Sequence, residues 1–200
     1  MKLYYSPGAC SMAPHIVLQE AGMKHAAEAV NLKTHQVGGS DYYKINPKGS
    51  VPALELDNGQ LLTENAVVIQ YICDQTQEAG LLPKAGTLER YRAMEWLNFI
   101  ATELHKGFGP LWNPNTLPEA RQQAVENLGK KFDFLAKHFK TNSFLMGQQF
   151  SAPDAYLFTV LNWTNFHKID MGKWPELKSY MERVGSRPAV QSTLKAEGLM

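Results

Sequence analysis

The sequence predicts two folded parts of different classes, an α/β part followed by an all-α part. Strand-like and helix-like runs alternate in the first part, whereas the second part contains only helix-like runs. Between them, residues 79–86 contain two glycines and a proline and show no apolar periodicity, which is typical of a linker. We therefore expect one domain over residues 1–78, the linker over 79–86 and a second domain over 87–200.

The first part is expected to contain a small mixed sheet. Four short runs have strand character: residues 2–5, 28–32, 53–56 and 60–62. Apolar residues at helical spacing over 11–21 predict a crossover helix, which makes the first two strands parallel. Asp57-Asn58-Gly59 separates the last two runs, and Asn-Gly in this place predicts a hairpin with a type I′ turn. A second helix is expected over 64–75.

The second part is expected to be entirely helical. Helices are predicted over residues 88–111, 118–139, 152–165, 175–186 and 189–196. An apolar stripe along the longest of them comprises Ala93, Leu97, Ile100, Leu104, Phe108 and Leu111. Ser151 and Asp154 predict a capping box in which the Asp154 side chain reaches back to the chain before its helix. Trp163 and Phe166 are interpreted as core residues.

Composition argues against several classes of protein. Lys plus Arg number 20 and Asp plus Glu 19, so the chain lacks the broad basic surface that binds nucleic acid. No apolar run approaches the ~20 residues that span a bilayer, and the turn at residues 6–8 interrupts any signal peptide. The two cysteines, Cys10 and Cys73, suit reduced thiols, with one disulfide as the alternative. We expect a cytoplasmic protein without a metal site.

Cys10 is the first candidate for chemistry. It follows a Pro-Gly turn and begins the helix expected over 11–21, where backbone N–H groups and the helix dipole favour a thiolate. A strand, a turn, a cysteine and a helix in this order are how thioredoxin-like domains present a reactive sulfur. Position 13 is Ala13, so no resolving cysteine stands nearby and an external thiol would have to serve. The alternative is a buried structural cysteine, which is how we interpret Cys73.

Val51-Pro52 immediately precedes the third strand. A proline is tolerated at a strand entry because its missing N–H lies outside the ladder. In a thioredoxin-like sheet this bond is usually cis, and we predict that it is cis here, with the backbone of Val51 turned outward to pair with a peptide. A trans bond is the general rule for any X–Pro pair.

Thr63-Glu64-Asn65 opens the second helix. A helix N-terminus binds a carboxylate and the Glu64 carboxylate binds an ammonium, so the two together match the head group of an α-amino acid. Ordinary capping also explains these residues, with Thr63 as the N-cap residue and Glu64 interacting with the helix dipole, and the two interpretations are compatible.

A polar stripe runs along the helix expected over 88–111, beside the apolar one. Its members are Glu95, Asn98, Thr102 and His105. Such stripes are commonly solvated faces. Alternatively, Asn98 and His105 line a cleft, where a histidine is a natural donor of a hydrogen bond or a proton near neutral pH.

Six motifs, in order along both parts of the chain, resemble those of the bacterial beta-class glutathione transferases. They are Met1-Lys2-Leu3-Tyr4-Tyr5-Ser6-Pro7-Gly8-Ala9-Cys10-Ser11, Asn46-Pro47-Lys48-Gly49-Ser50-Val51-Pro52-Ala53-Leu54, Leu62-Thr63-Glu64, Glu95-Trp96-Leu97-Asn98-Phe99, Glu103-Leu104-His105-Lys106-Gly107 and Asp154-Ala155-Tyr156-Leu157-Phe158. The ending Ala196-Glu197-Gly198-Leu199 also fits. The resemblance implies the glutathione transferase fold, with an N-terminal thioredoxin-like domain and a C-terminal all-helical domain.

The resemblance also implies roles for residues of this chain. Cys10 and His105 would be catalytic, with Cys10 beside the glutathione sulfur. The glutathione-binding residues would be Cys10, Lys33, His35, Val51, Pro52, Glu64, Asn65, Asn98, Thr102, Glu103, Leu104 and His105. Lys33 and His35 are alternatives for the glycyl carboxylate, and Asn65 replaces the small residue expected after Glu64.

The function that this resemblance implies is conjugation of the glutathione thiolate to small apolar electrophiles. Glutathione would be a co-substrate, no other cofactor would be needed, and the enzyme would be a homodimer without nucleic-acid or membrane partners. With Cys10 at the site, a glutathione-dependent thiol–disulfide reductase or a dehalogenase is the alternative. A third possibility is a ligand-binding protein that keeps the fold without activity.

Overall fold

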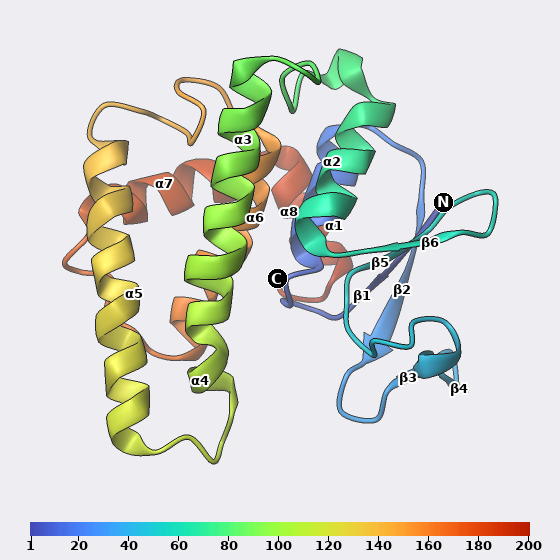
Figure 1. Ribbon diagram of the computed structural model, residues 1–200, viewed down its shortest axis with the longest axis horizontal. Helices are drawn as coiled ribbons and strands as arrows, with labels where there is room; N and C mark the ends of the chain where they lie inside the picture. Colours follow the sequence, from blue (N-terminus) through green and yellow to red (C-terminus); the bar gives the residue numbers. More distant parts are fainter. The chain divides into compact units, whose positions relative to one another are not determined.

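The computed structural model describes all 200 residues, which form two compact units (Figure 1). Unit 1 comprises Met1–Leu82 together with Arg187–Met200, and unit 2 comprises Pro83–Ser186. Unit 1 is built on a mixed sheet and unit 2 is helical, which confirms the predicted fold class. The last helix of the chain thus groups with the sheet unit, while the domain boundaries drawn from the sequence remain predictions.

Unit 1 has the strand order and directions expected of a thioredoxin-like sheet. Its strands are β1 (Lys2–Tyr5), β2 (Ala26–Asn31), β3 (Gln36–Val37), β4 (Ser40–Asp41), β5 (Ala53–Glu55) and β6 (Leu61–Thr63). They lie in the order β4-β3-β2-β1-β5-β6, with β1 parallel to β2 and all other pairs antiparallel. Its helices are α1 (Met12–Glu20), α2 (Asn65–Gln75) and α8 (Pro188–Ala196), with short 3₁₀ turns over Tyr42–Lys44 and Gln77–Ala79.

Both hairpins of unit 1 show how glycine determines a turn. The sequence prediction missed β3 and β4, although Gly38-Gly39 between them is a recognised hairpin signal and both residues have positive φ, 53° and 80°. Between β5 and β6 the hairpin was predicted but the type I′ turn was wrong. Only Gly59 has positive φ there, 79°, and the Gly59 N–H donates to the Leu56 carbonyl at 2.9 Å. A type I turn followed by a left-handed glycine fits this pattern.

Helix α1 lies at the centre of unit 1. Residues Met12 to Leu18 are all buried, because the helix packs against α2 and against α8 as well as beside the sheet (Figure 1). Cys73 of α2 is also buried, 4% exposed, which confirms its interpretation as a packed core thiol. Neither cysteine forms a disulfide.

Unit 2 is a bundle of helices around α6. Its helices are α3 (Leu88–Phe99), α4 (Gly109–Trp112), α5 (Pro118–Phe139), α6 (Ala152–Phe166) and α7 (Pro175–Gly185). Twelve of the 15 residues of α6 are buried, and a helix that is buried on all sides is the core of its bundle. No helix in the chain combines the length and the hydropathy that a membrane span requires.

The long helix predicted over 88–111 is continuous in space but changes its type. A π-helical turn, η3 (Ile100–His105), and a 3₁₀ turn, η4 (Lys106–Phe108), connect α3 to α4. The predicted apolar stripe is buried along its whole length. The polar stripe crosses the same π turn: Asn98 and Thr102 are exposed, and His105 is partly buried. Such π turns inside helices are frequently found at functional sites.

Candidate functional site

Cys10 lies in the turn that leads from β1 into α1. Gly8 has φ of 70°, and the Ala9 N–H donates to the Ser6 carbonyl at 3.0 Å. The Met12 N–H then donates to the Ala9 carbonyl at 3.0 Å, so the helical turn begins around the cysteine. The Cys10 side chain is partly exposed, and its Sγ donates to the Val51 carbonyl at 3.2 Å.

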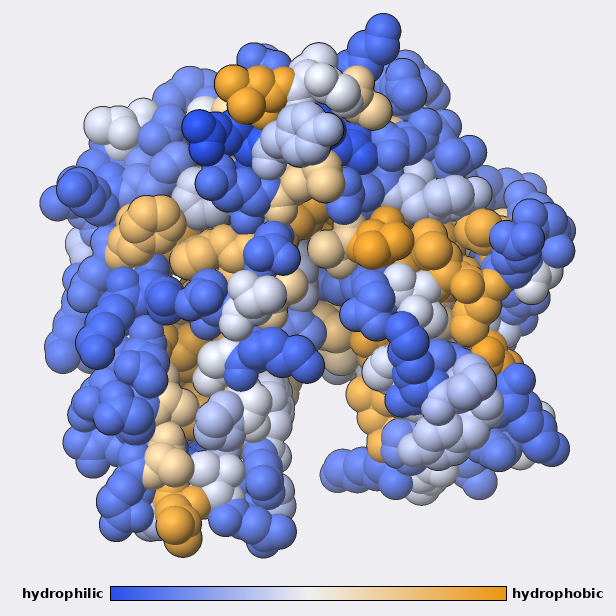
Figure 2. Space-filling model, in the orientation of Figure 1, coloured by the Kyte–Doolittle hydropathy of each residue, from blue (hydrophilic) through white to orange (hydrophobic).

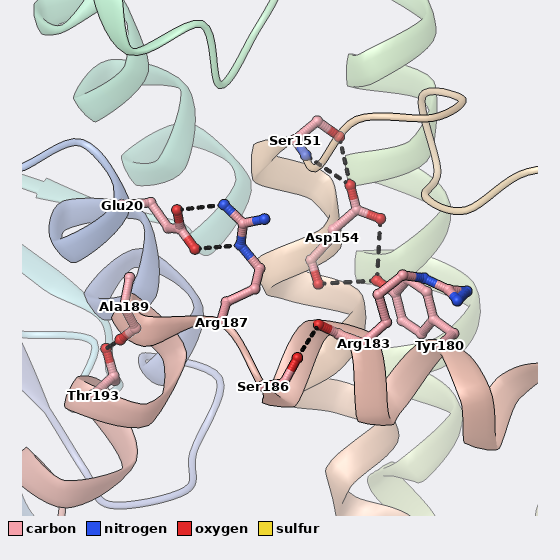
Figure 3. Close-up of polar contacts among 9 residues, drawn as sticks. All are labelled: Glu20, Ser151, Asp154, Tyr180, Arg183, Ser186, Arg187, Ala189 and Thr193. Atoms are coloured by element: carbon pink, nitrogen blue, oxygen red, sulfur yellow. Dashed lines mark hydrogen bonds and ion pairs between the residues drawn. The ribbon is translucent and has the colours of Figure 1, made fainter.

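The end of the chain supports this turn. The Gly8 N–H donates to Oε2 of Glu197 at 2.9 Å, and Oε1 of Glu197 lies 2.8 Å from Nδ1 of His15. The His15 and Glu197 side chains are 2% and 0% exposed. At the other end of α8, Arg187 holds Glu20 of α1 with two bonds of 2.6 and 2.8 Å (Figure 3). Sequence reasoning missed these pairs because their partners are far apart along the chain.

The Val51-Pro52 bond is cis, as predicted. The preceding loop is held by two bonds to the Ser50 carbonyl, from the Tyr42 hydroxyl at 3.0 Å and from the Asn46 amide at 2.7 Å. Asn46 is 1% exposed and its amide holds the loop before Pro52, so its presence in the motif over residues 46–54 is explained by the structure of this loop.

The start of α2 has an unusual geometry. The predicted Thr63 cap is wrong: Glu64 is the N-cap residue, with φ of 72° and without a side-chain capping bond. The next residue, Asn65, is 8% exposed, and both its Nδ2 and Oδ1 atoms are buried without a hydrogen-bond partner. Lys48 reaches this point, with Nζ 2.7 Å from Oε1 of Glu64 and 3.0 Å from Oγ1 of Thr63. Buried amide atoms without partners are uncommon in folded proteins.

The loop after β2 carries both candidates for the glycyl carboxylate. The Lys33 side chain is exposed. His35 has φ of 51°, its ring lies 4.6 Å from the ring of Tyr43, and its Nδ1 atom is buried without a hydrogen-bond partner. The two residues therefore differ in kind, one a solvated cation and the other a partly buried ring with a free nitrogen.

The remaining candidates belong to unit 2 and lie around the π turn. Asn98, Thr102 and Glu103 are exposed, and the Thr102 hydroxyl donates to the Asn98 carbonyl at 3.0 Å. Glu103 forms an ion pair of 2.6 Å with Lys131 of α5. Leu104 is fully buried, so only its backbone is able to meet a ligand.

His105 closes the π turn and contacts α6. Its Nδ1 atom lies 2.7 Å from the hydroxyl of Tyr156, and its ring lies 4.9 Å from the ring of Trp163. Burial, and to a lesser extent the neighbouring Lys106 charge, lowers the pKa of His105 to about 4. The imidazole is therefore neutral at neutral pH, with one ring nitrogen that donates a hydrogen bond and one that accepts.

Aromatic side chains form a cluster next to His105. Trp163 contacts the rings of both Phe108 and Trp112 at 5.5 Å, and Trp112 contacts Phe166 at 6.2 Å. Trp163 is core as predicted, at 3% exposed, but the prediction for Phe166 was wrong, because it is 58% exposed and the Trp112 ring beside it is 47% exposed. Apolar rings of this size at a surface often mark a binding site.

The structure thus places the predicted residues in four groups, one of which is the pair Lys33 and His35 in the loop after β2. In unit 1, Cys10 meets Val51, and Glu64 adjoins Asn65. In unit 2, the residues from Asn98 to His105 share one helical segment. No group of three or more His, Cys, Asp or Glu side chains is arranged to hold a metal ion.

Comparisons with known proteins identify the family. The N-terminal domain of glutathione S-transferases matches residues 8–75, and the C-terminal domain matches residues 99–188. The glutathione S-transferase GstA of Escherichia coli O157:H7 is 44% identical over the whole of both chains.

Solved structures agree with this match. The beta-class glutathione S-transferase of Sphingomonas chungbukensis has a TM-score of 0.96 and 45% identity, with all of both chains covered. A sphingomonad glutathione S-transferase, solved in complex with glutathione, has a TM-score of 0.96 and 43% identity, again over all of both chains. The chain therefore belongs to the glutathione S-transferase family, and it closely resembles the bacterial beta-class members.

Proposed function

We propose that the protein conjugates glutathione to small apolar electrophiles. The glutathione sulfur attacks an electrophilic carbon, a C–S bond forms, the leaving group departs with its electron pair, and the thiol proton passes to solvent. The observation that carries the proposal is the pair of unpartnered atoms on buried Asn65, next to Glu64 at the start of α2. The sphingomonad relative, 43% identical over its whole length, was solved in complex with glutathione.

The γ-glutamyl end of glutathione suits the start of α2. Its ammonium pairs with the Glu64 carboxylate, which Lys48 now contacts at 2.7 Å. Its α-carboxylate accepts from the first backbone N–H groups of α2 and from the Asn65 amide. Both the charge and the polarity of these groups complement an amino-acid head group.

The rest of the tripeptide extends along unit 1. The backbone of Val51, before Pro52, pairs with the cysteinyl unit, and this unit carries the sulfur to Cys10. The glycyl carboxylate is met by Lys33 or His35. The Nδ1 atom of His35 is buried without a hydrogen-bond partner, which favours a direct hydrogen bond from His35 to this carboxylate. Lys33 is exposed, which favours a long-range charge interaction with it.

The proposal also includes residues of unit 2. Asn98, Thr102, Glu103 and the Leu104 backbone supply polar groups around the ligand, and the neutral His105 donates a hydrogen bond to the reacting sulfur. The exposed rings of Trp112 and Phe166 accept the apolar electrophile. Glutathione is the co-substrate, and this chemistry requires no metal or other cofactor.

A second candidate function is glutathione-dependent thiol–disulfide exchange or dehalogenation. The observation that favours it is that Cys10 is a partly exposed thiol, outside any disulfide, at the proposed position of the glutathione sulfur. The experiment is an assay of the purified protein with glutathione against a halodinitrobenzene, a haloaromatic and a small disulfide. Conjugation of the first supports the proposed function, whereas turnover of the others alone supports the second. No turnover of any substrate would mean a ligand-binding protein.

We expect Asn65→Ala to raise stability while weakening glutathione binding. The variant removes two buried polar atoms without partners and introduces the better helix former, which together should raise the free energy of unfolding by about 1 kcal/mol. Loss of the amide should raise the KM for glutathione about fivefold, corresponding to one hydrogen bond. Thermal unfolding and steady-state kinetics measure the two effects. Asn58→Ala, in the exposed hairpin, is the control, and an unchanged KM would argue against this subsite.

We expect His105→Ala to reduce conjugation more than it reduces stability. Loss of a hydrogen bond to the sulfur should cost about 1–3 kcal/mol of transition-state stabilisation, which lowers kcat/KM roughly 5- to 160-fold. Because the pKa of His105 is about 4, the pH profile of the wild type should show no inflection from this residue between about pH 5 and 8. Unchanged turnover with a lower melting temperature would show that His105 is structural.

We propose a cytoplasmic homodimer. Three exposed apolar side chains lie on one face of α3, namely Leu88, Tyr91 and Met94, which are 67%, 59% and 38% exposed. Figure 2 shows that orange, apolar patches interrupt the mostly blue surface of the face it draws. Light scattering should give twice the chain mass of 22.4 kDa. Met94→Glu should shift the protein toward the monomer, and Glu89→Gln on the same helix should not; a wild-type monomer at micromolar concentration would refute the dimer.

A further inference from the structure

We propose that Tyr156 is a positioning residue, which fixes His105 in the tautomer whose Nε2 carries the proton. The Tyr156 hydroxyl lies 2.7 Å from Nδ1 of His105. Tyr156 is only 1% exposed, so its ring and hydroxyl have little freedom to turn away. The proposal concerns two residues of one unit and does not depend on the sheet unit.

The direction of this hydrogen bond follows from the chemistry of the two groups. A neutral imidazole has one protonated nitrogen and one nitrogen that accepts, and a phenol is a stronger donor than acceptor toward such a base. At neutral pH the His105 ring is neutral, since its pKa is about 4. Tyr156 therefore donates to Nδ1, and the ring proton must lie on Nε2.

The orientation of the ring is also held from the same helix. Trp163 lies two helical turns after Tyr156 on α6, and its ring meets that of His105 at 4.9 Å with an interplanar angle of 74°. Tyr156 meets His105 at 88°. Two edge-to-face contacts and one hydrogen bond leave a single orientation in which Nε2 points away from the Tyr156 hydroxyl, because the two ring nitrogens lie on opposite sides of the imidazole.

The consequence for catalysis rests on the proposed conjugation function. A donor to a thiolate must carry its proton before the sulfur arrives, and an Nε2–H fixed in advance requires no reorganisation during the reaction. The other tautomer would present a lone pair on Nε2, which repels a thiolate. Tyr156 would therefore act on the reaction through His105, without touching either substrate.

The first test is made on the ring itself. Protein labelled with ¹⁵N is examined by long-range ¹H–¹⁵N correlation at neutral pH, and the His105 signals are assigned by their loss in His105→Gln. The wild type should show the Nε2–H pattern, and Tyr156→Phe should show a mixture of tautomers. Tyr180→Phe is the matched control, because it removes another buried hydroxyl of unit 2, bonded to Asp154 at 3.1 Å, and should leave the pattern unchanged.

The second test is kinetic. Tyr156→Phe should lower kcat for conjugation about 3- to 10-fold, as expected for one lost hydrogen bond, with the KM for glutathione changed less than about twofold. Tyr180→Phe should lower the melting temperature without this fall in kcat. In the His105→Gln background, Tyr156→Phe should have no further effect on kcat.

The outcomes separate this inference from the function on which it rests. An Nδ1–H tautomer in the wild type overturns the proposal whatever the activity. The Nε2–H tautomer in Tyr156→Phe, together with wild-type kcat, also overturns it. If the wild type conjugates nothing, the proposed function fails, whereas the ¹⁵N pattern still decides whether Tyr156 sets the tautomer.

Discussion

Asp154→Ala is expected to lower the free energy of unfolding by about 4 kcal/mol, since it would leave several buried donors unpaired. The Asp154 carboxylate is 0% exposed. Its Oδ1 accepts from the Leu145 N–H at 2.9 Å and from the Tyr180 hydroxyl at 3.1 Å. Its Oδ2 accepts from the Ser151 N–H at 2.9 Å and from the Ser151 hydroxyl at 2.7 Å (Figure 3).

This network fixes the start of the central helix of unit 2. The predicted reach of Asp154 back to the Ser151 N–H is confirmed, and the same carboxylate also ties in the loop before α6 and the middle of α7. For a chain of this length, the loss should lower the melting temperature by roughly 10 °C. Asp133→Ala is the control: its exposed carboxylate accepts a 2.7 Å bond from Trp174 and should matter little. A shift below about 2 °C for Asp154→Ala would contradict the argument.

The effect of Asp154 should depend on pH. Burial raises the pKa of this carboxyl to about 6, from a usual value of 3.8, although the hydrogen bonds to it oppose the rise. Because the folded protein binds the proton more tightly than the unfolded chain, this group contributes most stability below about pH 4 and loses part of it as pH rises to about 6. The free energy of unfolding of the wild type should therefore exceed that of Asp154→Ala by less at about pH 6 than at about pH 4. Urea unfolding at several pH values would measure this difference.

Much of the fold could be predicted from the sequence because local signals determine it. Apolar periodicity located the helices, and the order of strand, crossover and hairpin determined the mixed sheet. The turn geometry was less accessible: Asn58-Gly59 marks a hairpin, but the five-residue connection between β5 and β6 selects a turn with positive φ at Gly59 alone. The π turn at Ile100–His105 was not predictable either, since helical periodicity assumes a uniform spacing.

Contacts between distant parts of the chain were the main features that the sequence could not provide. Glu197 is hydrogen-bonded to the Gly8 N–H, and the Tyr156 hydroxyl is hydrogen-bonded to His105. The sequence around these residues contains no signal that specifies such a distant partner. In contrast, Cys10, Glu64 and Asn65 could be selected as candidates because each follows a turn or opens a helix. Their positions in the sequence indicate where an anion or an ammonium could bind. The buried Asn65 atoms without hydrogen-bond partners, in contrast, are seen only in the structure.

Cys10→Ala is expected to abolish the mixed disulfide between the protein and glutathione. When the protein is treated with oxidised glutathione, the Cys10 thiolate attacks one sulfur of the disulfide, a new S–S bond forms, and one glutathione leaves as its thiolate. The Cys10 side chain is partly exposed, whereas Cys73 is 4% exposed, so only Cys10 offers an accessible sulfur. Ala13 provides no thiol that would release the bound glutathione.

Conjugation should respond differently to the same substitution. Glutathione supplies the attacking sulfur, and His105 remains as a donor, so kcat/KM of Cys10→Ala should fall by less than about tenfold, which corresponds to one hydrogen bond to the sulfur. Intact mass spectrometry should show one glutathione adduct on the wild type and on Cys73→Ala, and none on Cys10→Ala. An adduct that persists in Cys10→Ala and disappears in Cys73→Ala would place the reactive thiol in α2. The turn after β1 would then no longer be the position of the glutathione sulfur.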